Sequence, residues 1–181
     1  MAAEQLIPPR YADVTTTVEA AIRWCDGILA GHHMRLLIIG PHWSGKTHTA
    51  YAALRRLLGA GYPAQDIAAY ASYDLTREYD PARITHGPPV LFIDDLTHYP
   101  DGRHGVTSAA VDEPDLQAVL AVREASLADA ARRLTGHTSG SWIACASSRD
   151  RLEEAAGADI KDQLLVMADV ADLPPRPLPG H

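Results

Sequence analysis

The sequence predicts an α/β fold, a three-layer sandwich in which helices cover both faces of a mainly parallel, five-stranded sheet. Short apolar runs that suit buried strands recur at 35–40, 67–72, 90–94 and 141–147. The first run leads directly into a glycine-containing turn and then a segment of helical composition. Buried strands that alternate with helices favour a parallel sheet between two helical layers.

The N-terminal part predicts an extended lead-in and one helix. Residues 1–14 contain two adjacent prolines, and an N-cap is expected at one of Thr15–Thr17. Gly31 is expected to end this helix. Its predicted apolar face consists of Val18, Ile22, Cys25 and Leu29.

The remaining elements follow from composition and apolar spacing. In chain order they are a helix within 44–61, a polar loop at 97–112, a long helix at 112–134, short helices at 149–156 and 159–165, and a candidate fifth strand within 166–173. We expect a single domain over 1–173 and a proline-rich tail at 174–181.

Composition excludes several classes of protein. The chain has 181 residues, a net charge of -7 and two cysteines that form no C-x-x-C motif, which predicts a protein of a reducing cytoplasm. No basic segment precedes an apolar one at the N-terminus, and no run of about 18 apolar residues occurs, so no membrane partner is expected. The acidic balance argues against strong sequence-independent binding to nucleic acid, although a local arginine patch could still bind a single strand of DNA.

The most specific signal is GPHWSGKT at 40–47, which matches G-x-x-x-x-G-K-[ST] between a predicted strand and a predicted helix. In such a loop, backbone N–H groups and the helix N-terminus bind phosphate, Lys46 reaches the β- and γ-phosphates, and Thr47 ligates Mg²⁺. An ordinary glycine turn is the alternative. The predicted nucleotide-binding residues are Gly40, Pro41, His42, Trp43, Ser44, Gly45, Lys46, Thr47 and His48.

Two adjacent carboxylates, Asp94 and Asp95, end the apolar run VLFID. Neighbouring carboxylates repel each other and are costly to bury, so a cation or an activated water is a reason to keep them there. We expect Asp94 to hold Mg²⁺ through water and Asp95 to orient or deprotonate the attacking water. A solvated strand end is the alternative.

A weaker signal lies at the end of SWIACASSRD. The carboxyl ends of parallel strands lie at one edge of the sheet, beside the phosphate loop. Ser148 is therefore a candidate to sense the γ-phosphate or to position the water. Serine is also common at strand ends without such a role.

Together these motifs resemble those of the AAA+ ATPases, and within them the DnaC/IstB-like group of helicase loaders and transposition ATPases. The resemblance covers roughly residues 6–172. It is carried by LIPPRYADVT at 6–15, LLIIGPHWSGKTHTA at 36–50, VLFIDDL, the SSRD corner and IKDQLL at 160–165.

The resemblance implies a P-loop ATP switch that requires Mg²⁺, assembles head to tail in a nucleotide-dependent oligomer, and acts on a replicative helicase or a transposase, often over single-stranded DNA. Lys46, Thr47, Asp94, Asp95 and Ser148 match the nucleotide-site residues of the family.

The chain also departs from the family. The family places an arginine for a neighbour's ATP in the segment that IKDQLL resembles, and Gln163 stands there in this chain. A neutral amide cannot stabilise developing phosphate charge as an arginine does, so slow ATP hydrolysis is expected. Lys161, Arg149 or Arg151 could substitute. The segment Tyr73–Pro88 is short, and no separate helical lid domain is expected.

Two other functions stay open. A small-molecule kinase shares the phosphate loop and this chain length, but 97–112 is a poor arginine-bearing lid. A catalytically weak nucleotide-binding adaptor would be consistent with Gln163. Nine histidines raise the question of zinc, but their spacing and the absence of nearby cysteine disfavour it.

Overall fold

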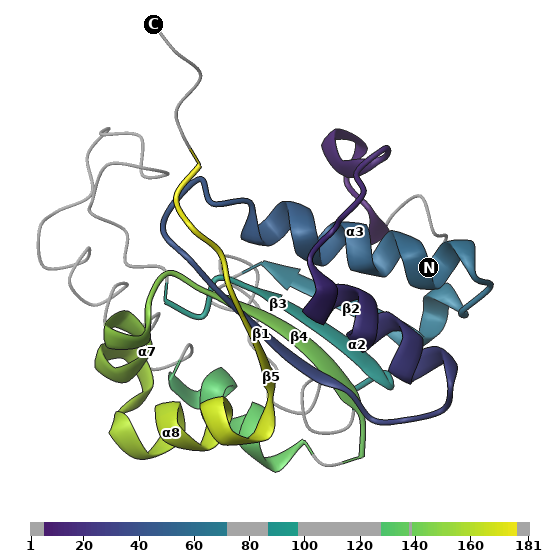
Figure 1. Ribbon diagram of the computed structural model, residues 1–181. Coiled ribbons are helices and arrows are strands. Elements are labelled where there is room, and N and C mark those ends of the chain that lie inside the picture. The colour runs from purple at the N-terminus through teal and green to yellow at the C-terminus, as the bar shows by residue number, and fades with distance from the viewer. Residues whose placement is uncertain (1–5, 72–86, 98–127, 138, 177–181) are drawn as a thin grey trace, which may run out of the picture.

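The computed structural model describes residues 6–71, 87–97, 128–137 and 139–176 (Figure 1). Within them, five strands form one parallel sheet in the order β2-β3-β4-β1-β5. The strands are β1 (Arg35–Ile39), β2 (Ile67–Ala71), β3 (Val90–Asp94), β4 (Ser141–Ala146) and β5 (Asp169–Asp172). The predicted α/β class and the candidate fifth strand are confirmed.

Helices cover both faces of the sheet. They are α2 (Glu19–Leu29), α3 (Lys46–Gly59), α7 (Arg149–Ala156), α8 (Ala158–Met167) and a helical segment at 128–136, with short 3-10 turns at Pro9–Tyr11 and Ala64–Asp66. In Figure 1, α2 and α3 lie on one side of the sheet, and α7 and α8 lie on the other. The predicted loop at 98–112 and the predicted helix up to residue 127 lie outside the described residues, as does the segment from Tyr73 to residue 86.

The alternation of strand residues divides the core into two parts. On β1, Leu36 and Ile38 pack with α2 and α3, whereas Leu37 and Ile39 pack with the 128–136 segment, α7 and α8. Helices therefore cover both faces of β1, which explains its continuous apolar run. β5 is an edge strand, and its more polar composition made it the weakest strand signal.

The predicted start and apolar face of α2 need correction. The N-cap is Val18, which has no side-chain cap, and Thr16 only accepts a hydrogen bond from the Val18 N–H at 3.1 Å. Leu29 is 44% exposed, and Trp24 is instead fully buried. The Trp24 Nε1–H donates to the carbonyls of Trp142 and Met34 at 2.9 and 3.1 Å, which turns this face of the helix toward the sheet.

Within the described residues, no helix is long and apolar enough to cross a membrane.

Candidate nucleotide site

A cavity of about 470 Å³ lies where the carboxyl ends of the parallel strands meet the start of α3. The phosphate-loop candidate follows β1, and the two aspartates lie at the end of β3, with β4 between these strands. The cavity is lined by Tyr11, His42, Trp43, Gly45, Lys46, Thr47, His48, Asp94, Asp95 and Arg176. The topology therefore gathers the two strongest predicted motifs around one space, as ligand sites of open α/β sheets require.

The loop presents hydrogen-bond donors to this space. Gly45 is the N-cap of α3 with φ +97°, a conformation that favours glycine, and it offers no side-chain cap. The first N–H groups of α3 therefore remain available to an anion. The Lys46 Nζ donates to the carbonyls of Gly40 and Pro41 at 2.7 and 2.9 Å, which places its charge inside the loop.

Close packing explains the first glycine of the motif. A Cβ on Gly40 would lie 2.6 Å from the Ser44 Oγ and 2.7 Å from the Leu173 carbonyl oxygen, so no larger residue fits. The Ser44 Oγ is itself buried and has no hydrogen-bond partner among the described residues. A buried polar atom without a partner next to a row of backbone donors fits a site that takes a polar ligand.

Two residues that line the cavity have an unusual backbone conformation. Among the described residues, the non-glycine positions with positive φ are Trp43, at 64°, and Asp95, at 60°. The Trp43 side chain is 76% exposed and makes an edge contact with the His42 ring at 5.0 Å. Unfavourable backbone conformations of this kind cluster at functional sites.

Thr47 and Asp94 form the pair expected to hold a metal ion. The Thr47 Oγ1 lies 3.0 Å from both carboxylate oxygens of Asp94. Burial raises the pKa of Asp94, and the negative charge of Asp95 raises it further, while hydrogen bonds from Thr47 and the Cys145 thiol act in the opposite direction. A hydroxyl and a carboxylate are the hard oxygen ligands that Mg²⁺ prefers, with water and phosphate completing its shell. No group of three or more His, Cys, Asp or Glu among the described residues could hold a metal by itself.

A chain of hydroxyl groups holds Asp95. The Thr97 hydroxyl donates to the Asp95 Oδ1 at 3.1 Å, and the Thr97 N–H lies 3.3 Å from the same oxygen. The Ser147 N–H donates to the Thr97 Oγ1 at 2.7 Å, and the two hydroxyl oxygens lie 2.8 Å apart. Thr97, which is 3% exposed, thereby connects the end of β4 to the carboxylate after β3.

No protein-family model and no curated protein matches this chain. Solved structures do. The crystal structure of the DnaC helicase loader matches with a TM-score of 0.60 and 13% identity, over 92% of this chain and 99% of that one. DnaI matches with a TM-score of 0.52 and 13% identity, over 96% and 92%. A structure of the replication initiator DnaA bound to AMPPCP and single-stranded DNA matches with a TM-score of 0.53 and 13% identity, over 92% and 50%.

The chain has a DnaC-like AAA+ P-loop fold. This confirms the resemblance drawn from the motifs at the level of architecture, because the matching solved structures include the DnaC helicase loader and the five strands of this chain are all parallel.

Ser148, the predicted sensor of the γ-phosphate, and its neighbour Ser147 make different contacts. The Ser148 Oγ accepts a hydrogen bond from the Arg151 N–H at 3.1 Å and thereby caps α7. It does not line the cavity, whereas its neighbour Ser147 reaches Asp95 through Thr97. Sequence reasoning missed Thr97, Ser147 and the buried Cys145. A hydroxyl two residues after the second aspartate was the one available signal.

The residues considered as substitutes for the missing arginine form ion pairs within this chain. Gln163 is exposed on α8 and lines a separate cavity of about 420 Å³. The Lys161 Nζ lies 2.6 Å from Glu153 on α7, and its side chain is only 18% exposed. The other two candidates also form ion pairs within the chain, Arg149 with Asp172 at 2.7 Å and Arg151 with Glu154 at 2.8 Å.

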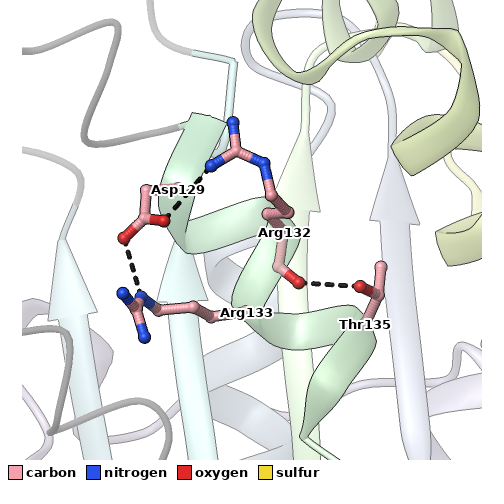
Figure 2. Close-up of polar contacts among 4 residues, drawn as sticks. All are labelled: Asp129, Arg132, Arg133 and Thr135. Atoms are coloured by element: carbon pink, nitrogen blue, oxygen red, sulfur yellow. Dashed lines mark hydrogen bonds and ion pairs between the residues drawn. The ribbon is translucent and has the colours of Figure 1, made fainter.

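Arg132 and Arg133 are adjacent in the 128–136 segment, where a local arginine patch for nucleic acid could form. Figure 2 shows that Arg132 and Arg133 both turn toward Asp129, at 3.3 and 2.7 Å. The Thr135 hydroxyl also donates to the Arg132 carbonyl at 2.7 Å. These pairs neutralise part of the positive charge that phosphate contacts would require.

Proposed function

We propose that this chain is an ATP-binding switch of AAA+ type that acts in DNA replication, as a helicase loader, or in transposition. The observation that carries the proposal is the contact of Thr47 with Asp94, at 3.0 Å, beside the glycine loop that holds Lys46. The replication proteins DnaC, DnaI and DnaA, which share the fold, support the choice of process.

The start of α3 and four side chains at the cavity have proposed tasks. The N–H groups at the start of α3 bind the phosphates of ATP, and the Lys46 ammonium turns from the loop carbonyls to phosphate oxygens. Thr47 and Asp94 hold Mg²⁺, which neutralises phosphate charge when bound. Asp95, held by Thr97, orients the attacking water so that ATP becomes ADP and phosphate.

We propose that turnover by the isolated chain is slow. Gln163 on α8 offers a neutral amide where the family offers an arginine to its neighbour, and an arginine in trans contributes about 10³- to 10⁵-fold in related NTPases. The bound state, rather than rapid hydrolysis, would then serve to engage a replicative helicase or a transposase.

The first experiment compares the two lysines of the chain. The Lys46→Ala variant is expected to lose about 100-fold in affinity for AMPPCP with Mg²⁺, because charge-assisted contacts of this kind contribute about 1.5–3 kcal/mol each. Lys161→Ala is the matched control, because it removes the other lysine from a surface ion pair. Isothermal titration calorimetry measures both, and tight binding by the Lys46 variant would refute the site.

The second experiment separates binding from turnover. We expect Asp95→Asn to bind AMPPCP like the wild type and to lose release of phosphate from ATP, because an amide is a poor base. The assay is run with and without single-stranded DNA and a replicative helicase. Turnover equal to that of the wild type would remove Asp95 from the proposed chemistry.

The same assays address the alternatives. Phosphoryl transfer to a small acceptor without release of phosphate to water would favour a small-molecule kinase. Intact binding without turnover under any condition would favour an adaptor in which ATP only stabilises the fold. Size-exclusion chromatography with AMPPCP and single-stranded DNA tests the proposed nucleotide-dependent oligomer, which is expected to elute earlier than the free chain.

A further inference from the structure

Arg176, in the segment after β5, lies against the phosphate loop. A Cβ on Gly45 would lie 2.7 Å from the Nη2 and 2.9 Å from the Cζ of Arg176, so the guanidinium covers the N-cap residue of α3. Arg176 also lines the same cavity as Lys46 and Thr47. The expected domain boundary at residue 173 therefore leaves out one of the groups that line this cavity.

The path of the chain explains why Arg176 is there. β5 pairs in parallel with β1, the strand that leads into the loop. The pairing continues after β5, because the Leu173 N–H donates to the Ile39 carbonyl at 2.7 Å, and the Leu173 carbonyl packs against Gly40. Pro174 and Pro175 then restrict the backbone to an extended path as far as Arg176.

The charge of Arg176 is available to a ligand. Arg176 is exposed, and no hydrogen bond or ion pair links its side chain to any described residue. Other arginines near this edge of the sheet are paired, such as Arg149 with Asp172. A free guanidinium next to a row of backbone N–H donors suits phosphate, because its planar fork can donate two parallel hydrogen bonds to phosphate oxygens.

We infer that Arg176 binds the phosphate groups of the nucleotide from within the same chain, so that the segment 174–176 completes the site. The inference rests on the proposed function and names a further phosphate ligand for it. A second cation beside Lys46 offsets the negative charges of Asp94 and Asp95 in the cavity. It also supplies, in cis, the planar cation that Gln163 does not offer to a neighbour.

The test compares Arg176→Ala, Arg176→Lys and Arg56→Ala by calorimetric titration with AMPPCP and with ADP, each with Mg²⁺. We expect Arg176→Ala to weaken AMPPCP binding by about 10-fold. Arg176→Lys should recover part of the affinity, because lysine keeps the charge but not the fork. Arg56→Ala removes an exposed arginine that pairs with Asp26 and does not line the cavity, so it should bind like the wild type.

The outcomes separate this inference from the proposed function. If the wild type binds neither nucleotide, both fail. If the wild type binds AMPPCP and Arg176→Ala binds it equally well or more tightly, Arg176 is not a phosphate ligand, while the proposed function stands. An equal loss of affinity in Arg56→Ala would also overturn the inference, because the effect would then reflect net charge. Thermal unfolding without nucleotide should give the same midpoint for all of these proteins.

Discussion

Ser147 donates its backbone N–H to the Thr97 hydroxyl oxygen across 2.7 Å, and this bond joins the end of β4 to the turn after β3. The same hydroxyl donates to the Asp95 carboxylate, so its one hydrogen and its acceptor capacity are both used. The carboxylate proposed to orient water is therefore held by a neighbouring strand, and Thr97 is a positioning residue for it.

Thr97→Val tests this relationship. The change keeps the shape of the side chain but leaves the partly buried Ser147 N–H without its acceptor, which should lower the free energy of unfolding by about 1–3 kcal/mol. Release of phosphate should fall by about 10- to 100-fold, because Asp95 loses the contact that orients it. Urea denaturation and a phosphate-release assay measure the two effects.

Thr97→Ser is the matched control, because it restores the hydroxyl. It should recover most of the turnover, although it loses one buried methyl group. Equal turnover in the valine and serine variants would show that the hydroxyl does not position Asp95.

Asp94→Asn tests the cost of the buried carboxylate. The pKa of Asp94 in the folded chain is raised above 3.8, mainly by burial, so the folded state keeps a proton that the unfolded state releases as pH rises. This group therefore makes the fold less stable as pH rises from 3.8 through its raised pKa. Asp94→Asn should be more stable than the wild type at neutral pH and should lose this advantage below pH 3.8.

The same variant should lose the effect of Mg²⁺ on nucleotide affinity, because an amide oxygen carries no charge. Urea denaturation at several pH values and titration with AMPPCP with and without Mg²⁺ measure the two properties. An advantage that grows toward acid pH would contradict the assigned direction of the pKa shift.

Gly40→Ala tests the close approach between the loop and the segment after β5. The new methyl group would meet the Leu173 carbonyl at 2.7 Å, and the backbone on one side must move. We expect a loss of about 1–3 kcal/mol in the free energy of unfolding and weaker AMPPCP binding. Gly59→Ala, at the end of α3 with nothing within 4 Å, should be neutral or stabilising by up to about 1 kcal/mol. Equal effects of the two changes would refute the packing argument.

Trp24→Phe and Trp142→Phe compare two buried indoles. The Trp24 Nε1–H donates to two backbone carbonyls, whereas the Trp142 Nε1 has no partner among the described residues. Trp24→Phe should therefore destabilise the chain by about 1 kcal/mol more than Trp142→Phe, the usual net contribution of a hydrogen bond. Thermal and urea denaturation measure the difference, and the reverse order would contradict it.

Local patterns sufficed for much of this protein. Four apolar runs predicted β1 to β4, because a strand covered on both faces needs a continuous apolar sequence. The more polar β5 was only a candidate strand within 166–173. GPHWSGKT and the pair Asp94–Asp95 predicted the walls of one cavity, because parallel strands end at the same edge of a sheet. Of the two lysines of the chain, Lys46 lies in the loop as its motif predicted. Lys161, which was considered as a substitute for the missing arginine, forms an ion pair with Glu153 on α7.

Local patterns did not predict contacts between groups that are distant in the sequence. The apolar face of α2 depended on carbonyls of Met34 and Trp142 that receive the Trp24 N–H. The choice between Ser147 and Ser148 depended on a bend of the chain between β4 and α7, and a shift of one residue turns a side chain to the other face.

The sequence by itself determined the α/β class, the phosphate loop and the two aspartates, because each is encoded in a short run of residues whose spacing sets its local structure. Only the tertiary structure decided that Thr97 holds Asp95 and that Arg176 lies over Gly45. The pairing of β5 with β1 carries the end of the described chain to the loop near its beginning, and that contact depends on the order of strands in the sheet.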